Sequence, residues 1–357
     1  MNYLRLMKGF TMNKRIILKI LQSIGFTCKR IKKRISFSTP ELKILPTMNS
    51  EMSESNCAWV GTFQLVWNDF MDNEIKGPVK FVEGNNKTVN DLNKQEFKKT
   101  DIDESTYYIK SGTICPELKK EIETCIKNKF SETSDILNKI NFTYHPLKKL
   151  FYAMLKKDFQ FLEEFDYLDK GIFHNDKLEF VEYFGIDSDT KEEVYKNISV
   201  LFYSDNDYAV KLHTKSEDEV ILYRTDKIKA FNEYYKDLKN KTQKYKGEKE
   251  FTWNDRLKVP RFDFSAETSF EDVENKIIKN TDGAKISKTI ETIKFKMDEC
   301  GVKLRSEAAF EMMFLGAPNF DDMRYFYFDK PFIMFLKEKD KQVPYFAMRV
   351  VDAVSLN

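Results

Sequence analysis

The residue with the clearest chemical potential is a cysteine at the start of an apolar stretch. Cys57 follows Asn56, and the stretch 56–72 places large apolar residues at helical spacing. A thiol at a helix N-terminus has a lowered pKa and is therefore a better nucleophile. Such a nucleophile also needs a histidine base and an orienting Asn or Asp. The three histidines, His145, His174 and His213, lie far apart and outside any recognised catalytic motif.

The other reactive side chains form no recognised motif. The five cysteines are scattered without a CxxC pair, at Cys28, Cys57, Cys115, Cys125 and Cys300. This pattern indicates neither a zinc site nor a disulfide framework, and the glycine-rich nucleotide-binding patterns are absent from the sequence. The adjacent acids Glu163–Glu164 and Asp321–Asp322 are typical of a solvated surface. We therefore predict no metal, no cofactor and, apart from the Cys57 hypothesis, no catalytic residue.

Charge divides the chain into a basic beginning and an acidic remainder. Residues 1–50 hold eleven lysines and arginines against one acid, Glu41. Subtracting these from the totals of 59 bases and 57 acids leaves 48 bases and 56 acids, a net charge of −8. An acidic body argues against nucleic acid as a partner. A hydrophobic content of 41% is enough for a large core.

The first 47 residues differ in composition from the rest of the chain. The apolar run at 16–24 is interrupted by Lys19 and is too short to span a bilayer, and no small-residue cleavage site follows it. Two interpretations of this segment stay open. It could form an amphipathic helix on a membrane surface, or translation could begin later, at Met12 or Met48. We expect residues 1–47 to be a disordered or non-native extension and residues 48–357 to be a single domain. Free cysteines and the lack of a clear signal peptide favour the cytoplasm.

Helices are predicted first along the chain, and strands follow them. Trp59, Phe63, Trp67 and Phe70 form one stripe and predict a helix over 56–72, and Pro116 suits the first turn of a second helix. Further helices are expected at 227–238 and 269–279. Strands are expected after residue 150, within 150–161, 167–184, 200–203, 209–212, 220–223, 257–264, 293–297 and 325–351. This order predicts an α+β fold.

The C-terminal strands resemble those of a known family. The segment 326–332 reads Phe-Tyr-Phe-Asp-Lys-Pro-Phe and resembles the C-terminal strand of the serpins, the serine protease inhibitor superfamily. The segment 345–351 is similar to the closing strand of that family, with Met348 where glycine is usual. Leu257–Phe262 resembles a further strand, and Phe151–Lys156 is similar to a fourth. The resemblance implies mixed and antiparallel sheets with N-terminal helices and an exposed loop before the C-terminal strands.

The fifth similar segment is the hinge of the serpin reactive loop. Asp298–Gly301 supplies an acidic pair and a glycine, and Ser-Glu-Ala-Ala follows four residues later. By this resemblance the hinge residues are Gly301, Ser306, Glu307, Ala308 and Ala309, and counting along the loop places a scissile bond near Asn319 or Phe320. Long loops are uncommon without a function, which favours a role for residues 306–324.

The resemblance implies a protein partner and leaves two functions open. A serpin inhibitor traps a protease when its cut loop inserts into a sheet, and the other choice is a non-inhibitory protein that binds a protease, another protein or a ligand. Arg305, Phe310 and Glu311 stand where small residues would ease insertion, and Tyr152 stands where the family has a buried Asn. We therefore favour a non-inhibitory binding protein. The enzymatic alternative is a papain-like cysteine hydrolase, because Cys57–Trp59 is similar to the start of the helix that holds the papain cysteine.

Overall fold

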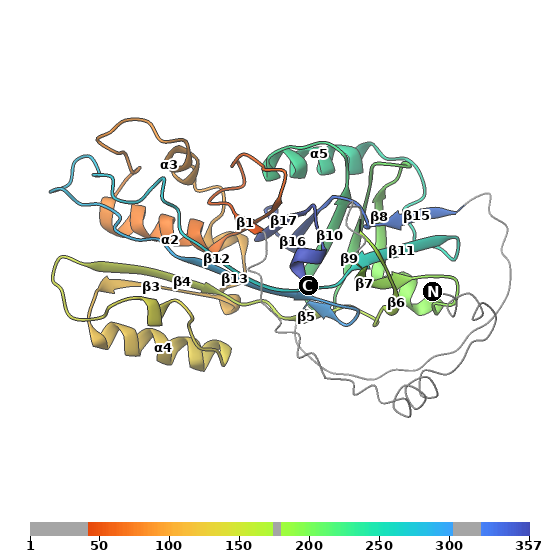
Figure 1. Ribbon diagram of the computed structural model, residues 1–357, viewed down its shortest axis with the longest axis horizontal. Helices are drawn as coiled ribbons and strands as arrows, with labels where there is room; N and C mark the ends of the chain where they lie inside the picture. Colours follow the sequence, from red (N-terminus) through yellow and green to blue (C-terminus); the bar gives the residue numbers. More distant parts are fainter. Residues whose placement is uncertain (1–41, 174–179, 303–322) are drawn as a thin grey trace, which may run out of the picture. The chain divides into compact units, whose positions relative to one another are not determined.

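A computed structural model describes residues 42–173, 180–302 and 323–357 (Figure 1). Its largest sheet has seven strands, in the order β1 (Leu42–Ile44), β2 (Asn56–Val60), β17 (Phe346–Val350), β16 (Phe332–Glu338), β10 (Asp218–Arg224), β9 (Tyr208–His213) and β8 (Ile198–Phe202). All pairs are antiparallel except β1 with β2. Strand β16 is buried along its whole length, so it forms the centre of the main core.

Smaller sheets complete the fold. A four-stranded sheet has the order β15 (Arg324–Tyr327), β11 (Asp255–Pro260), β7 (Phe180–Ile186) and β6 (Asp166–Ile172). Three antiparallel pairs join β3 (Tyr107–Thr113) to β4 (Lys149–Leu155), β12 (Phe262–Thr268) to β13 (Glu291–Met297), and β5 (Phe159–Gln160) to β14 (Gly301–Val302). The mixture of sheets and helices confirms the predicted α+β class.

Four α-helices are described. They are α2 (Thr62–Phe70), α3 (Lys87–Leu92), α4 (Pro116–Phe130) and α5 (Phe231–Lys244), and a π-helical turn at Met71–Ile75 continues α2. Short 3-10 turns lie at Lys99–Asp101, Glu104–Thr106, Leu137–Lys139, Glu192–Asn197 and Val354–Leu356. In the part of the chain that the structure describes, no helix is long and apolar enough to cross a membrane.

Several predicted elements form for the expected reasons. Helix α4 begins with Pro116 in its first turn and ends at Ser131, which has left-handed backbone angles. Strand β13 alternates buried and less buried residues, as its apolar spacing predicts. Helix α5 begins at Phe231 and extends to Lys244, beyond the predicted limit at residue 238.

The predicted helix over 56–72 is wrong at its beginning. Residues 56–60 are strand β2, which pairs with β17, and the helix begins only at Thr62. Trp59 is buried in that strand, so its helical spacing from Phe63 is coincidental. A short strand and a helix joined by one glycine, Gly61, have the same apolar spacing as a single helix.

Two more boundaries differ from the predictions. The predicted helix over 269–279 is a series of turns, with Asn275 in left-handed conformation and an isolated bridge between Ile277 and Lys285. Strand β1 lies before Met48, and Ile44 and Leu45 are buried. Residues 42–47 therefore belong to the folded unit, whereas the prediction of an extension at 1–41 falls outside the described residues.

Candidate functional site

Two antiparallel strand pairs lie next to each other without joining into one sheet. In the described residues β4 pairs with β3 and β13 pairs with β12, and no ladder joins β4 to β13. The pairs converge at one end, because β5 follows β4 after three residues and pairs with β14, which follows β13. Figure 1 shows the two pairs running alongside each other. We call this arrangement the split sheet, and each of its inner strands has one unpaired edge.

The convergence point depends on a glycine that the sequence singled out. Gly301 has φ of +151° and pairs with Gln160. A Cβ at this position would lie 2.4 Å from the carbonyl oxygen of Phe159 and 2.7 Å from the Cα of Gln160. Another side chain would both strain the backbone and push β14 away from β5. The predicted hinge glycine is therefore the residue that lets the two pairs meet.

Charged groups fix the turn before that glycine. The Arg261 guanidinium lies 3.1 Å from a Glu299 carboxylate oxygen and 2.9 Å from one of Glu182. Lys296 lies 3.5 Å from Asp298, and the Asp298 carboxylate also accepts a hydrogen bond from the Cys300 backbone N–H. Arg261 immediately follows β11, so it ties the four-stranded sheet to the end of β13.

Helix α2 spans the split sheet on one face. The Phe70 ring, at its C-terminal end, meets the Phe151 ring of β4 edge to face, with centroids 5.1 Å apart. At its N-terminal end, Thr62 and Phe63 donate hydrogen bonds to Glu291 of β13. One helix thus contacts both strands that border the gap.

Helix α4 and the turn after it cover the opposite face of β4. A cluster of buried residues from α4 packs with Tyr152 of β4. The segment that follows α4 reaches the other strand pair, because Asp135 forms an ion pair with Lys294 of β13 at 2.6 Å and Lys139 forms one with Glu267 of β12. These surface ion pairs hold the two strand pairs together only weakly.

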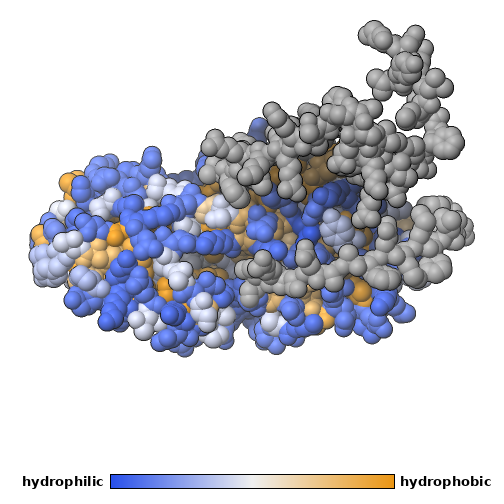
Figure 2. Space-filling model, turned by 60° about the horizontal axis from the view of Figure 1, so that its bottom comes forward, coloured by the Kyte–Doolittle hydropathy of each residue, from blue (hydrophilic) through white to orange (hydrophobic). Residues whose placement is uncertain are grey.

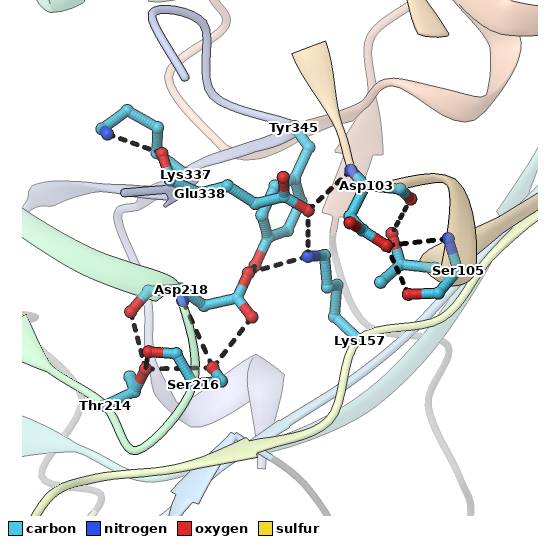
Figure 3. A network of polar contacts seen from close by, with 10 residues as sticks. Asp103, Ser105, Lys157, Thr214, Ser216, Asp218, Lys337, Glu338 and Tyr345 are labelled. Atoms are coloured by element: carbon cyan, nitrogen blue, oxygen red, sulfur yellow. Dashed lines mark hydrogen bonds and ion pairs between the residues drawn. The ribbon is translucent and has the colours of Figure 1, made fainter. Parts of the chain in front are cut away.

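A buried lysine joins the split sheet to the seven-stranded sheet (Figure 3). The Lys157 ammonium, between β4 and β5, lies 2.9 Å from Asp218 of β10 and 2.5 Å from Glu338 of β16. Its side chain is 8% exposed, and its ammonium group lies over the Tyr345 ring. Tyr345 donates to Asp218, and the Asp103 backbone N–H donates to Glu338. Ser216 also donates a hydrogen bond to Asp218, so the network satisfies two buried carboxylates with one cation and three neutral donors.

The far end of the predicted loop is also fixed. Arg324 of β15 makes hydrogen bonds of 2.7 Å to both carboxylate oxygens of Asp255, and it donates to the carbonyl oxygens of Glu248 and Glu250. The Tyr325 N–H donates to the Tyr203 hydroxyl. The chain is therefore anchored on both sides of residues 303–322, at β14 and at β15.

Most of the predicted site lies outside the described residues. Gly301 is described, whereas Ser306, Glu307, Ala308, Ala309, Asn319 and Phe320 fall within 303–322. Their assignment as hinge and scissile bond stays a prediction. Arg261, Lys157 and Glu291 were missed, because isolated charged residues far apart in the sequence form no motif.

The Cys57 hypothesis is contradicted in its premise. Cys57 is the second residue of strand β2 and is fully buried, so it does not lie at a helix N-terminus. Its sulfur contacts the Ser53 hydroxyl and the Ser55 carbonyl oxygen. His145 lies exposed in a turn, His213 is hydrogen-bonded to Ser199 at 2.8 Å, and His174 is not described. Cys57 is therefore a core residue.

One group of side chains has the spacing of a metal site. The ligand atoms of Glu164, Glu299 and Cys300 lie within 4.8 Å of one another. Burial, followed by the hydrogen bond to Glu164 and nearby acids, raises the pKa of the Cys300 thiol to about 12. A thiol held in its protonated form is a poor metal ligand, and Glu299 already pairs with Arg261. The group is therefore better described as part of the anchored turn.

The face of the molecule in Figure 2 is mainly hydrophilic over the described residues, and apolar residues appear there as separate patches. The most exposed large apolar side chains include Leu147, 88% exposed, and Tyr144, 65% exposed, in the turn before β4. Single exposed apolar residues are common on soluble proteins. These residues do not identify a partner by themselves.

Comparisons with known proteins identify the fold. No protein-family model and no curated protein matches the chain. The thermophilic serpin tengpin, in its native state, matches with a TM-score of 0.50 and 12% identity, over 85% of this chain and 90% of that one. Human thyroxine-binding globulin complexed with thyroxine matches with a TM-score of 0.43 and 14% identity, over 86% and 77% of the two chains.

Two further matches are also to serpin-fold structures. Serpin48 of the insect Tenebrio molitor matches with a TM-score of 0.40 and 13% identity, over 83% of this chain and 74% of that one. In another thyroxine-binding globulin structure the match spans 66% of this chain and 65% of that one. The likeness to tengpin and the arrangement of sheets described above agree with the resemblance found in the C-terminal strands. The chain has a serpin-like fold.

Proposed function

We propose that this protein is a non-inhibitory, non-catalytic member of the serpin-like group and that it binds a partner protein through residues 306–324. The observation that supports this most is the covering of β4 on both faces. Helix α2 packs on one face through Phe70 and Phe151, and α4 packs on the other through the cluster around Tyr152. A strand inserted beside β4 would therefore lie beneath a helix on each side.

That covering makes insertion unfavourable for this particular loop. Successive side chains of a strand point to opposite faces, so Phe310 and Glu311 would face different helices. A carboxylate in either place loses its hydration without a partner, and a phenylalanine needs volume in a close-packed interior. The loop is better suited to contact a partner from outside the sheet.

A second candidate, the protease inhibitor, is favoured by a different observation. The inner edges of β4 and β13 are unpaired over the described residues. Unpaired strand edges are templates for an added strand. Gly301 stands at the end of the gap, where the loop would begin to enter. An inhibitor would use residues 306–319 to fill this gap after cleavage near Asn319 or Phe320.

One experiment separates the two functions. The full chain is incubated with a panel of serine and cysteine proteases and followed by denaturing gel and by melting temperature. Our proposal predicts cleavage within 306–324, no complex that survives denaturation, and a nicked protein with nearly unchanged melting temperature. A stable covalent complex, or a large rise in melting temperature after cleavage, contradicts the proposal and supports the inhibitor. A loop that resists every protease contradicts both, because both need it exposed.

A further inference from the structure

Three short segments that lie outside the sheets form a small ribbon of their own. Its segments are residues 80–82, before α3, and residues 277–279 and 284–286, between β12 and β13. Antiparallel bridges join Phe81 to Ile278 and Ile277 to Lys285. Backbone hydrogen bonds of 2.8 and 2.9 Å connect the first segment to the second, and one of 2.9 Å connects the second to the third. We call it the basic ribbon, because its three segments contain three lysines and no acid.

One face of the basic ribbon is anchored in the core. Phe81 and Ile278 are only 2% and 1% exposed. Residues opposite each other in an antiparallel pair share a face, and neighbours along a strand alternate between the two faces. Since Phe81 and Ile278 point inward, the residues on either side of them point outward.

The outward face combines apolar and positively charged side chains. Val82 and Ile277 lie opposite each other there, 56% and 44% exposed. The three lysines of the ribbon, Lys80, Lys279 and Lys285, are exposed as well. Lys80 lies opposite Lys279, and the bridge from Ile277 to Lys285 places that lysine on the same face. Two adjacent β-branched side chains are thus flanked by three ammonium groups.

The charge of this face is not neutralised by the rest of the described chain, in which none of the three lysines forms an ion pair. The Glu83 carboxylate, next to the first segment, accepts a hydrogen bond from the Ile277 backbone N–H, and Asp282 lies in the exposed turn between the other two segments. Lys276 adds a fourth cation, which lies over the Phe81 ring. The chain after residue 50 has a net charge of −8, so this basic surface stands out on an acidic protein and is available to an anionic partner.

We propose that the outward face of the basic ribbon docks on a membrane that contains anionic lipid. The lysines then lie at the level of the lipid headgroups, and Val82 and Ile277 enter the boundary between headgroups and acyl chains. The exposed apolar pair favours a membrane over a soluble anionic polymer, because such a polymer offers no apolar layer for these side chains to enter. The inference goes beyond the proposed function, since it concerns another surface and another class of partner.

Two contributions to membrane binding are expected, and they differ in their response to salt. Near an anionic surface each lysine strengthens binding about fivefold, and added salt weakens this contribution by screening the charges. Burial of each half-exposed aliphatic side chain strengthens binding about threefold more. Loss of the lysines should therefore reduce both the affinity and its salt dependence, whereas loss of the apolar pair should reduce the affinity alone.

The test measures co-sedimentation of the full chain with phosphatidylcholine vesicles that contain or lack phosphatidylserine. We expect binding only to the vesicles with phosphatidylserine, and weaker binding as salt is added. A ribbon variant combines three substitutions: Lys80→Gln, Lys279→Gln and Lys285→Gln. It should bind about 100-fold more weakly at low salt.

The matched control removes the same total charge from another part of the surface. It replaces three exposed lysines that form no ion pair within the described residues: Lys191→Gln, Lys196→Gln and Lys236→Gln. Because these lysines do not lie on the ribbon, the control should weaken vesicle binding by less than about threefold. Both variants should keep the melting temperature of the wild type, since all six side chains are exposed.

A second variant, Val82→Ser with Ile277→Ser, separates a membrane from a soluble anionic polymer. It keeps the lysines, so we expect about tenfold weaker vesicle binding with an unchanged salt dependence. Binding that needs the lysines but not Val82 and Ile277 is purely electrostatic and overturns docking on a membrane.

Three other results also overturn the proposal: no binding to the vesicles with phosphatidylserine, unchanged binding in the ribbon variant, or equal losses in the ribbon variant and its control. Residues 1–41 are the same in every variant, so lipid contacts of their own cannot produce the expected differences. No protease and no cleavage of the loop is needed, so failure of this test is separate from failure of the proposed function.

Discussion

The seven-stranded sheet and the split sheet are both built from apolar strands covered by helices, but they differ in how completely their strands are paired. In the first, β16 pairs along both edges and is buried from Phe332 to Glu338. Helix α5 covers it with Phe231 and Tyr235, whose rings contact Phe335. In the second, β4 and β13 each keep one unpaired edge, and α2 reaches across with one ring contact and two hydrogen bonds at its N-terminus.

The difference shows which part of the fold is fixed and which can change. A strand with two partners loses many hydrogen bonds together when it moves, whereas an edge held by a few contacts opens at lower free energy. The seven-stranded sheet therefore serves as the rigid support. The split sheet, with the loop anchored at β14 and β15, is the part in which function is expected.

The largest expected effect is in the centre of the rigid sheet. Phe335→Ala removes a fully buried ring and should lower the free energy of unfolding by about 4 kcal/mol. Phe151→Ala in β4 removes a half-buried ring and should cost about 2 kcal/mol. Urea denaturation of both variants measures the difference. Equal losses would contradict the contrast between the two regions.

The next largest effect is at the junction of the two regions. Lys157→Met leaves Asp218 and Glu338 buried without their cation and should cost about 3 kcal/mol. Adding Asp218→Asn and Glu338→Gln to this variant removes the uncompensated charges, so most of the loss should be recovered. Denaturation of the single and the triple variants gives both values. If Lys157→Met alone left the free energy of unfolding unchanged, the network would not hold the two regions together.

A substitution at Gly301, where the two strand pairs converge, should lower the free energy of unfolding by less than the loss of Lys157. Gly301→Ala places a Cβ against the Phe159 carbonyl in a left-handed conformation, and we expect a loss of about 2 kcal/mol. Gly77→Ala is the control, because no atom lies within 4 Å of its Cβ position, and it should change stability by about 0.5 kcal/mol or less. Similar losses in the two variants would argue against close approach at Gly301.

The smallest effect concerns the charge of Asp237 on helix α5, which covers the seven-stranded sheet. Burial alone would raise the pKa of Asp237, but hydrogen bonds from Lys229 and Tyr223 and the charge of Lys241 lower it to about 2. Because this pKa is lower in the folded state, the charged Asp237 carboxylate stabilises the fold above about pH 4. This contribution is lost as the pH falls through about 2.

Asp237→Asn tests that contribution. It should cost about 1 kcal/mol at pH 7, after allowance for solvent screening of a partly exposed pair. Urea titrations at pH 7 and at pH 3 measure the loss, which should shrink at the lower pH. A loss that does not change with pH would mean that the Asp237 charge is not its source.

The parts of the fold that the sequence predicts are those with a strong local pattern. Pro116 marks the start of α4, and the alternation around Phe295 defines β13. The C-terminal strands are recognised because 326–332 keeps several family residues together. In contrast, Trp59 was assigned to a helix, because a strand followed by a one-residue turn has helix-like spacing.

The candidate site is predictable only where a local conformation demands one residue. Gly301 was singled out from the sequence as a hinge residue, because the acidic pair and the glycine stand together there, and its role as a hinge stays a prediction. Arg261 and Glu299 are far apart in the sequence and are brought together only by the fold, so no sequence motif predicts their ion pair. Glu291 continues the inward row of β13, but a single acid in an apolar alternation is not by itself a sequence motif.

The most direct test of the account is hydrogen exchange along β4 and β13 before and after the loop is cut. The full chain is nicked within 306–324, and exchange of the unpaired inner-edge amides is followed by mass spectrometry. A binding protein whose loop does not insert should show the same exchange in both strands after cleavage. New protection in β4 and β13 together would mean that the loop has filled the gap, and it would contradict the account.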